Sequence, residues 1–124
     1  MDLTQFFKSV LDEDKAPVVI CALDHTIIYM NPSAIERYSG YGGGSLLGKS
    51  LLDCHNKRSG EMINKVLDWF RASAENNRVH TFYNEKENKD VYMIALRGDD
   101  KELIGYYEKH EYRDKDSTDF YSIT

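Results

Sequence analysis

The sequence contains only two cysteines and two prolines, with no long hydrophobic run and no excess of basic charge. Cys21 and Cys54 are too few for a disulfide framework, and we expect both to be reduced thiols in a cytoplasmic protein. No apolar run approaches the ~20 residues of a membrane helix, and residues 1–5 lack the basic start of a signal peptide. The net charge of -5 disfavours a general nucleic-acid binder, which needs a basic face for phosphate. The sequence therefore predicts neither membrane insertion nor a nucleic-acid partner.

The length and the composition of the chain both fit one folded domain. A chain of 124 residues lies within the ~100–200 residues usual for a single domain. Its 41% hydrophobic and 30% charged residues are typical of a soluble globular protein. Nine tyrosines, five phenylalanines and one tryptophan argue against disorder, because disordered chains are poor in aromatic residues.

The N-terminal residues follow an amphipathic helical pattern. Apolar side chains recur at helical spacing at Leu3, Phe6, Phe7, Val10 and Leu11. An isolated helix of this length is marginal in water, so this apolar stripe must pack on the outer face of its own sheet or on a second copy. We divide the chain into this helix and its linker at 1–15, a domain at 16–113 and a polar tail at 114–124.

The order of elements within the domain predicts an α+β fold with an antiparallel sheet. Asn31 can cap a short helix whose first position suits Pro32, and Ser59 is a good N-cap for a longer one. The expected elements are strands at 18–23 and 26–30, helices at 34–38 and 59–74, and strands at 79–83, 91–96 and 103–112.

The segment from Gly43 to Ser50 matches the pattern G-x-x-x-x-G-K-[ST] letter for letter. In a true P-loop, backbone N–H groups wrap phosphates, the lysine neutralises them and the Ser or Thr binds magnesium. That motif needs a buried strand before it and a helix after it. Here residues 34–38 predict a helix before it, and residues 51–55 are too short for the helix after it. We predict a glycine loop and a turn, with a P-loop nucleotide-binding enzyme as the alternative.

Cys54 and His55 are the next candidates for chemistry. Two adjacent residues do not close a zinc site, and the other histidines show no ligand spacing with them. A Cys–His nucleophile pair needs a third orienting group, which the sequence does not show. We therefore expect neither a metal site nor a catalytic residue, and predict that the protein is not an enzyme.

Alternation along the strands divides their side chains between two faces. On the last strand, one face holds Tyr106, Glu108 and His110, and the other holds Leu103, Gly105 and Tyr107. Gly105 would let a ligand or a helix approach the backbone closely. On the strand at 91–96, the cavity face is either the set Tyr92, Ile94 and Leu96 or the set Val91, Met93 and Ala95.

Residues 16–113 resemble a PAS domain. The opening hairpin at 16–34, whose Asn31 starts the first helix, carries the resemblance, which continues through 47–55 and the final strands. PAS domains often have a glycine followed by Lys or Arg where Gly48-Lys49 stands, which explains the P-loop match. The stretch Asp53-Cys54-His55-Asn56-Lys57-Arg58-Ser59 is similar to a bacterial sub-group with an Asp/Asn-Cys-His-Pro-x-Lys-Ser turn, with Asn56 in place of the proline.

The resemblance implies a five-stranded antiparallel sheet with helices over one face, enclosing a small ligand cavity. Asp53-Cys54-His55-Asn56 is not the Asn-Cys-Arg-Phe type of motif that photoactive flavin PAS domains use. The helix at 59–74 has no axial histidine, which leaves His55 as the haem candidate. A small metabolite is the expected ligand, with haem and flavin left open. We expect the site to be lined by His55, Cys54, Met62, Val66, Phe70, Tyr92, Ile94, Leu96, Gly105 and Tyr107.

The sequence as a whole thus predicts a bacterial sensory and signal-transduction module. Its expected partners are a second copy, through the apolar stripe of the N-terminal helix, and a signalling protein. Besides the P-loop enzyme, the alternative function is a protein interaction domain that binds no ligand.

Overall fold

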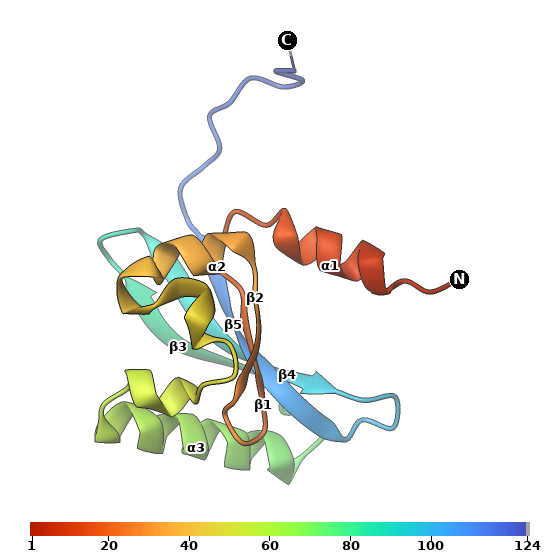
Figure 1. The fold of residues 1–124 in the computed structure, drawn as a ribbon, viewed down its shortest axis with the longest axis vertical. Coiled ribbons are helices and arrows are strands. Elements are labelled where there is room, and N and C mark those ends of the chain that lie inside the picture. The colour runs from red at the N-terminus through yellow and green to blue at the C-terminus, as the bar shows by residue number, and fades with distance from the viewer. Residues whose placement is uncertain (124) are drawn as a thin grey trace.

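Five antiparallel strands form one sheet, and the helices between β2 and β3 lie over one of its faces (Figure 1). The computed structural model describes residues 1–123. The strands are β1 (Val19–Ala22), β2 (Ile27–Met30), β3 (Arg78–Asn84), β4 (Lys89–Arg97) and β5 (Leu103–Tyr112). The α-helices are α1 (Thr4–Asp12), α2 (Pro32–Arg37) and α3 (Lys57–Ala72), and the 3-10 helices are η1 (Ser39–Tyr41), η2 (Gly43–Leu46) and η3 (Leu51–Cys54). The α+β class and the antiparallel sheet are confirmed.

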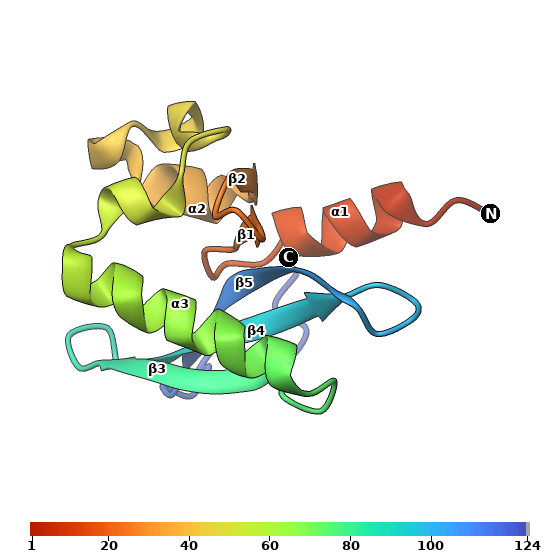
Figure 2. The ribbon, with the colours of Figure 1, turned by 90° about the horizontal axis from the view of Figure 1, so that it is seen from below.

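The first and last strands of the domain meet in the middle of the sheet. The strand order is β2-β1-β5-β4-β3, so β1 pairs with both β2 and β5. Residues 31–77 therefore cross from one edge of the sheet to the other. Figure 2 shows this crossover, with α2 and the 3-10 helices at one end and α3 running along the sheet.

Two asparagine side chains set where the helices of the crossover begin. Asn31 Oδ1 accepts a hydrogen bond from the Ala34 N–H at 2.9 Å, as expected for the cap of α2. Asn56 Oδ1 accepts one from the Ser59 N–H at 2.8 Å, so α3 begins at Lys57. The prediction that Ser59 caps this helix is wrong, because Asn56 is an equally good cap and precedes it.

One stripe of α3 fills the core. Ile63, Leu67 and Phe70 are buried at the i, i+4, i+7 spacing of a single helical face. They pack against buried residues of the sheet, including Cys21 of β1, Met93 of β4 and Tyr106 of β5.

The inward face of β4 is the one that carries Val91 and Met93, both of which are buried. Alternation sends Tyr92, Ile94 and Leu96 to the opposite face. The prediction that these three residues face the cavity is therefore wrong. Hydrophobicity could not separate the two faces, because both carry apolar side chains along the same strand.

The segment from Gly43 to Ser50 runs beside β2 rather than between a strand and a helix. The Gly48 N–H donates to the Ile27 carbonyl at 2.8 Å, and the Lys49 carbonyl accepts from the Ile27 N–H at 2.9 Å. Within the described chain, η1 precedes this segment and the four-residue η3 follows it. The flanking structure of a P-loop is missing on both sides, as the sequence predicted.

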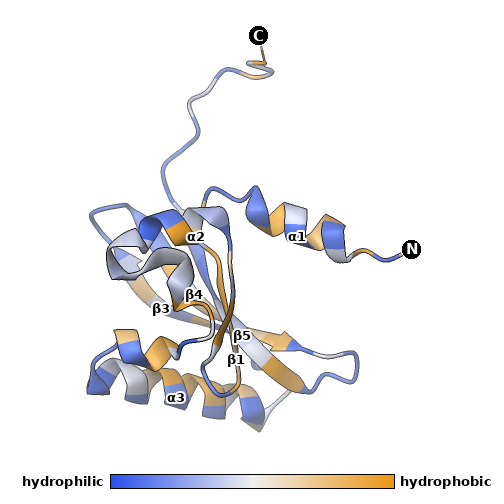
Figure 3. Ribbon diagram, viewed as in Figure 1, coloured by the Kyte–Doolittle hydropathy of each residue, from blue (hydrophilic) through white to orange (hydrophobic). Residues whose placement is uncertain are grey.

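Helix α1 projects from the edge of the domain and carries an uncovered apolar stripe (Figure 3). Phe6 is 60% exposed and Val10 is 71% exposed. The C-terminal end of α1 is attached to the domain: Asn31 Nδ2 donates to the Leu11 carbonyl at 2.9 Å, and the Tyr29 hydroxyl donates to Asp12. Among residues 1–123, no helix combines the length and the apolar character needed to cross a bilayer.

Candidate functional site

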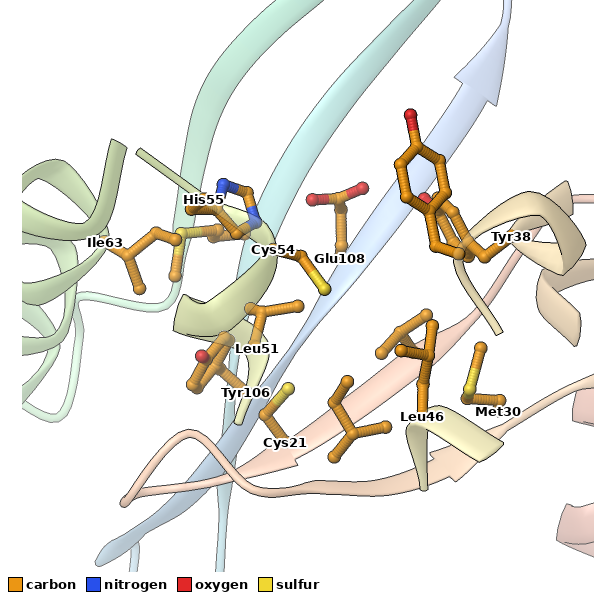
Figure 4. A pocket seen from close by; sticks show the side chains of 14 residues that line it. Cys21, Met30, Tyr38, Leu46, Leu51, Cys54, His55, Ile63, Tyr106 and Glu108 are labelled. Atoms are coloured by element: carbon orange, nitrogen blue, oxygen red, sulfur yellow. The ribbon is translucent and has the colours of Figure 1, made fainter. Parts of the chain in front are cut away.

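A cavity of about 290 Å³ lies between the inward face of the sheet and the crossover segment (Figure 4). Its sheet wall includes Cys21, Met93 and Tyr106, and its helical wall includes Leu46, Leu51 and Ile63. Most of this wall is apolar. The 3-10 helices and the start of α3 cover this part of the sheet without packing directly on it. The space between them is the cavity.

Burial raises the pKa of three of the polar groups that line this cavity. Burial raises the pKa of the Cys21 thiol to about 11, so the sulfur is protonated at neutral pH. Burial also raises the pKa of the Tyr38 and Tyr106 hydroxyls. Glu108 contributes the one carboxylate among the described residues that line the cavity. The site can therefore surround an apolar molecule and offer it a few hydrogen bonds.

The Tyr106 hydroxyl connects the cavity wall to α3 through a buried histidine. His25 Nδ1 lies 2.7 Å from the Tyr106 oxygen, and His25 Nε2 lies 2.9 Å from Asn64 Oδ1. Because the Asn64 oxygen can only accept, Nε2 is the donor, and in this tautomer Nδ1 accepts the proton of the Tyr106 hydroxyl. His25 sits in the β1–β2 turn with a φ of 71°.

A second cavity, of about 590 Å³, adjoins the first and lies between α3 and the strands β3, β4 and β5. The two share lining residues, among them Tyr38, His55 and Glu108. In Figure 4, Glu108 projects from β5 between His55 and Tyr38. This carboxylate therefore lies where the two cavities meet.

The structure brings four of the predicted site residues to these cavities. Cys54 and His55 line the first, and His55, Met62 and Val66 line the second. Phe70 is fully buried in the core and lines neither.

The other five predicted residues lie elsewhere in the sheet. They are Tyr92, Ile94 and Leu96 of β4 and Gly105 and Tyr107 of β5, and none lines either cavity. A Cβ on Gly105 would lie 2.5 Å from the Cys21 carbonyl oxygen, so the glycine admits the backbone of β1 and not a ligand. Tyr107 alternates with the buried Tyr106 and faces away from it.

Sequence reasoning missed Cys21, Tyr106 and Glu108 as wall residues. Strand alternation correctly places Tyr106 and Glu108 on the same face of β5. The prediction that a ligand approaches at Gly105, however, puts the cavity on the opposite face of that strand, and this is wrong. Within residues 1–123, no three His, Cys, Asp or Glu side chains gather as a metal site would require. Cys54 and His55 therefore stand as a pair of cavity residues.

Comparison with known proteins identifies the fold. No model of a known protein family matches the chain, and no curated protein matches it. Among solved structures, a PAS domain from Colwellia psychrerythraea superposes with a TM-score of 0.64 at 14% identity, covering 90% of this chain and 97% of that one. The PAS domain of BvgS from Bordetella pertussis gives 0.64 at 14% identity, over 93% and 89%.

A third structural relative extends this likeness. The sensory box sensor histidine kinase from Vibrio cholerae gives a TM-score of 0.58 at 15% identity, covering 87% of this chain and 89% of that chain. All three structures share the sheet and the covering helices described above. The chain has the fold of PAS domains.

Proposed function

We propose that this chain is a sensory module that binds a small organic ligand inside the fold and passes the bound state to a partner protein. The observation that carries the proposal is the cavity of about 290 Å³, whose wall is mostly apolar and includes one carboxylate among the described residues. Concave, mostly apolar spaces with a few convergent polar groups are typical of small-molecule sites. The PAS-type fold, found also in a sensor histidine kinase, supports the signalling role. The proposal assigns no catalytic residue.

The decisive experiment is native mass spectrometry of the purified protein, together with its visible absorption spectrum. A small-metabolite ligand predicts a mass adduct and a colourless sample. A visible band would instead identify haem or flavin as the ligand. If no adduct forms and no compound in a metabolite library raises the melting temperature, the ligand-binding role is wrong and the interaction-domain alternative replaces it.

A cavity-filling variant locates the ligand. Leu51 is half-buried and lines the cavity, so Leu51→Trp should occupy the space and abolish the adduct. Ile104 is 53% exposed on β5, so Ile104→Trp adds the same bulk outside the cavity and should leave the adduct unchanged.

We also propose that α1 mediates contact with a second copy of the chain, through Leu3, Phe6, Phe7, Val10 and Leu11. The support is the exposure of this stripe, which the domain's own sheet does not cover. Attachment of the end of α1 to Asn31 and Tyr29 gives the helix a fixed base next to β2.

A further inference from the structure

Two basic side chains of the second cavity each have a buried nitrogen without a hydrogen-bond partner in the described chain. Among residues 1–123, Lys89 Nζ and His110 Nδ1 are the buried side-chain polar atoms without one. Both residues line the cavity of about 590 Å³. Lys89 pairs with Tyr112 and Val91 pairs with His110, so Lys89 and His110 are diagonal neighbours on the inward face of the sheet.

The nearest carboxylate to Lys89 is already engaged. Glu87 Oε1 is 3.5 Å from Lys89 Nζ, too far for a strong hydrogen bond. The two Glu87 oxygens each accept from Arg37 at 2.7 Å, and Oε2 also accepts from Asn84 at 2.9 Å. The Lys89 side chain is 1% exposed, so water outside the protein does not solvate its three donors. Burial, followed by the nearby positive charge of Arg37, lowers the pKa of Lys89, although Glu87 opposes the shift.

His110 uses one of its two ring nitrogens in a hydrogen bond. Its Nε2 lies 3.0 Å from Glu108 Oε1, and because the carboxylate accepts, Nε2 donates. Its Nδ1 is buried without a partner among the described residues. With the ring proton on Nε2, Nδ1 can accept a hydrogen bond but cannot donate one.

The rest of the cavity is more cationic than anionic and has one apolar side. Among the described residues that line it, Arg37, Arg58 and Lys89 are basic side chains. Glu108 is the one acidic side chain among these lining residues. Residues of the first turn of α3 also line it, and the start of a helix favours anions. Met62, Val66 and Val91 supply apolar surface.

We propose that this second cavity binds a small organic acid, whose carboxylate accepts a hydrogen bond from Lys89 Nζ while its apolar body packs on Val66 and Val91. The inference rests on the proposed ligand-binding function and names the chemical class of the ligand. A monocarboxylate fits better than a phosphate, because Glu108 repels a second negative charge. An anion here would supply the acceptor that Lys89 Nζ lacks.

The test uses hexanoate as the probe, with hexanol and inorganic phosphate as comparisons, in calorimetric titrations of the full chain. Hexanoate should bind more tightly than hexanol, which has the same chain without the charge. Lys89→Met should weaken hexanoate binding about tenfold or more, as expected for loss of a charge-assisted hydrogen bond. It should leave hexanol binding unchanged. Methionine keeps the buried shape, and thermal unfolding of the variant verifies that it folds.

The matched control is Lys109→Met, which removes the same charge from a side chain that is 37% exposed on the other face of β5. It should leave hexanoate affinity unchanged. Equal binding of hexanoate and hexanol, or equal loss in both lysine variants, would overturn the anion site while leaving an apolar ligand cavity intact. Binding of phosphate without hexanoate would overturn the carboxylate assignment. Absence of binding by all three probes would overturn this inference, whereas the proposed function depends on the adduct measured by mass spectrometry.

Discussion

His25 Nδ1 lies 2.7 Å from the hydroxyl oxygen of Tyr106, although 81 residues separate them in the sequence. Tyr106→Phe keeps the ring that walls the cavity but leaves the buried His25 nitrogen without its donor. We expect the free energy of unfolding to fall by about 1–3 kcal/mol, the range for an orphaned buried polar group. Urea denaturation measures this. Tyr107→Phe, on the opposite face of the same strand, is the control and should change stability little.

The contact between His25 and Tyr106 could not be predicted from the sequence, because it joins segments that are far apart in the chain. Local signals were reliable where one residue controls its neighbours: Asn31 and Pro32 predicted the start of α2 correctly. Alternation was also right in grouping Tyr106 with Glu108. The periodicity of a strand, however, divides residues into two faces without naming the inward one, and β4 carries Tyr92 and Ile94 on one face and Val91 and Met93 on the other. The cavity wall depends on contacts between distant segments, which no local pattern contains.

The assignment of the β4 faces can be tested by a pair of truncations. Met93 is 6% exposed in the core, so Met93→Ala should cost about 2–5 kcal/mol through lost burial and a cavity. Leu96 is half-buried on the opposite face, so Leu96→Ala should cost about 1 kcal/mol or less. Denaturant midpoints for the two variants decide between the faces, and the reverse order of costs would place Leu96 inside.

The ion pair between Arg37 and Glu87 predicts a loss of stability in acid. Two hydrogen bonds from Arg37 lower the pKa of Glu87 to about 2, compared with about 4.3 in an unfolded chain. A lowered carboxyl pKa stabilises the folded state above the unfolded pKa, and this stabilisation disappears as the pH falls through the folded pKa. Because the Glu87 side chain is 33% exposed, solvent screening keeps the effect near 1 kcal/mol.

Thermal unfolding at a series of pH values measures this effect. Between about pH 5 and pH 2, the wild type should lose more stability than Glu87→Gln, which has no proton to gain. Glu85→Gln changes an exposed carboxyl in the same turn and should follow the wild type. Parallel curves for all three proteins would show that the Arg37 pair contributes nothing in solution.

The segment from Gly43 to Ser50, which matches the P-loop pattern, should bind no nucleotide. The loop lies beside β2, with η1 before it and η3 after it, so its backbone is not arranged to wrap phosphates. Lys49→Ala should leave both stability and nucleotide binding unchanged, because the wild type should bind no ATP in a calorimetric titration. Micromolar ATP affinity in the wild type, lost in the variant, would restore the nucleotide-binding alternative.

The last prediction concerns α1 and its exposed stripe. Phe6 and Val10 are 60% and 71% exposed, and a short helix with an uncovered apolar face is marginal in water unless that face packs. If a second copy covers the stripe, replacing Phe6 and Val10 by glutamate places two charges in the contact and should convert a dimer to a folded monomer. The control is Gln5→Glu with Ser9→Glu, which adds two acidic charges at polar positions of the same exposed helix. It should remain dimeric in light scattering at tens of micromolar protein, since a two-fold contact buries the apolar stripe and leaves the polar side in solvent. A wild type that is monomeric at this concentration, or a control that dissociates equally, would exclude the homodimer and leave the stripe for another partner.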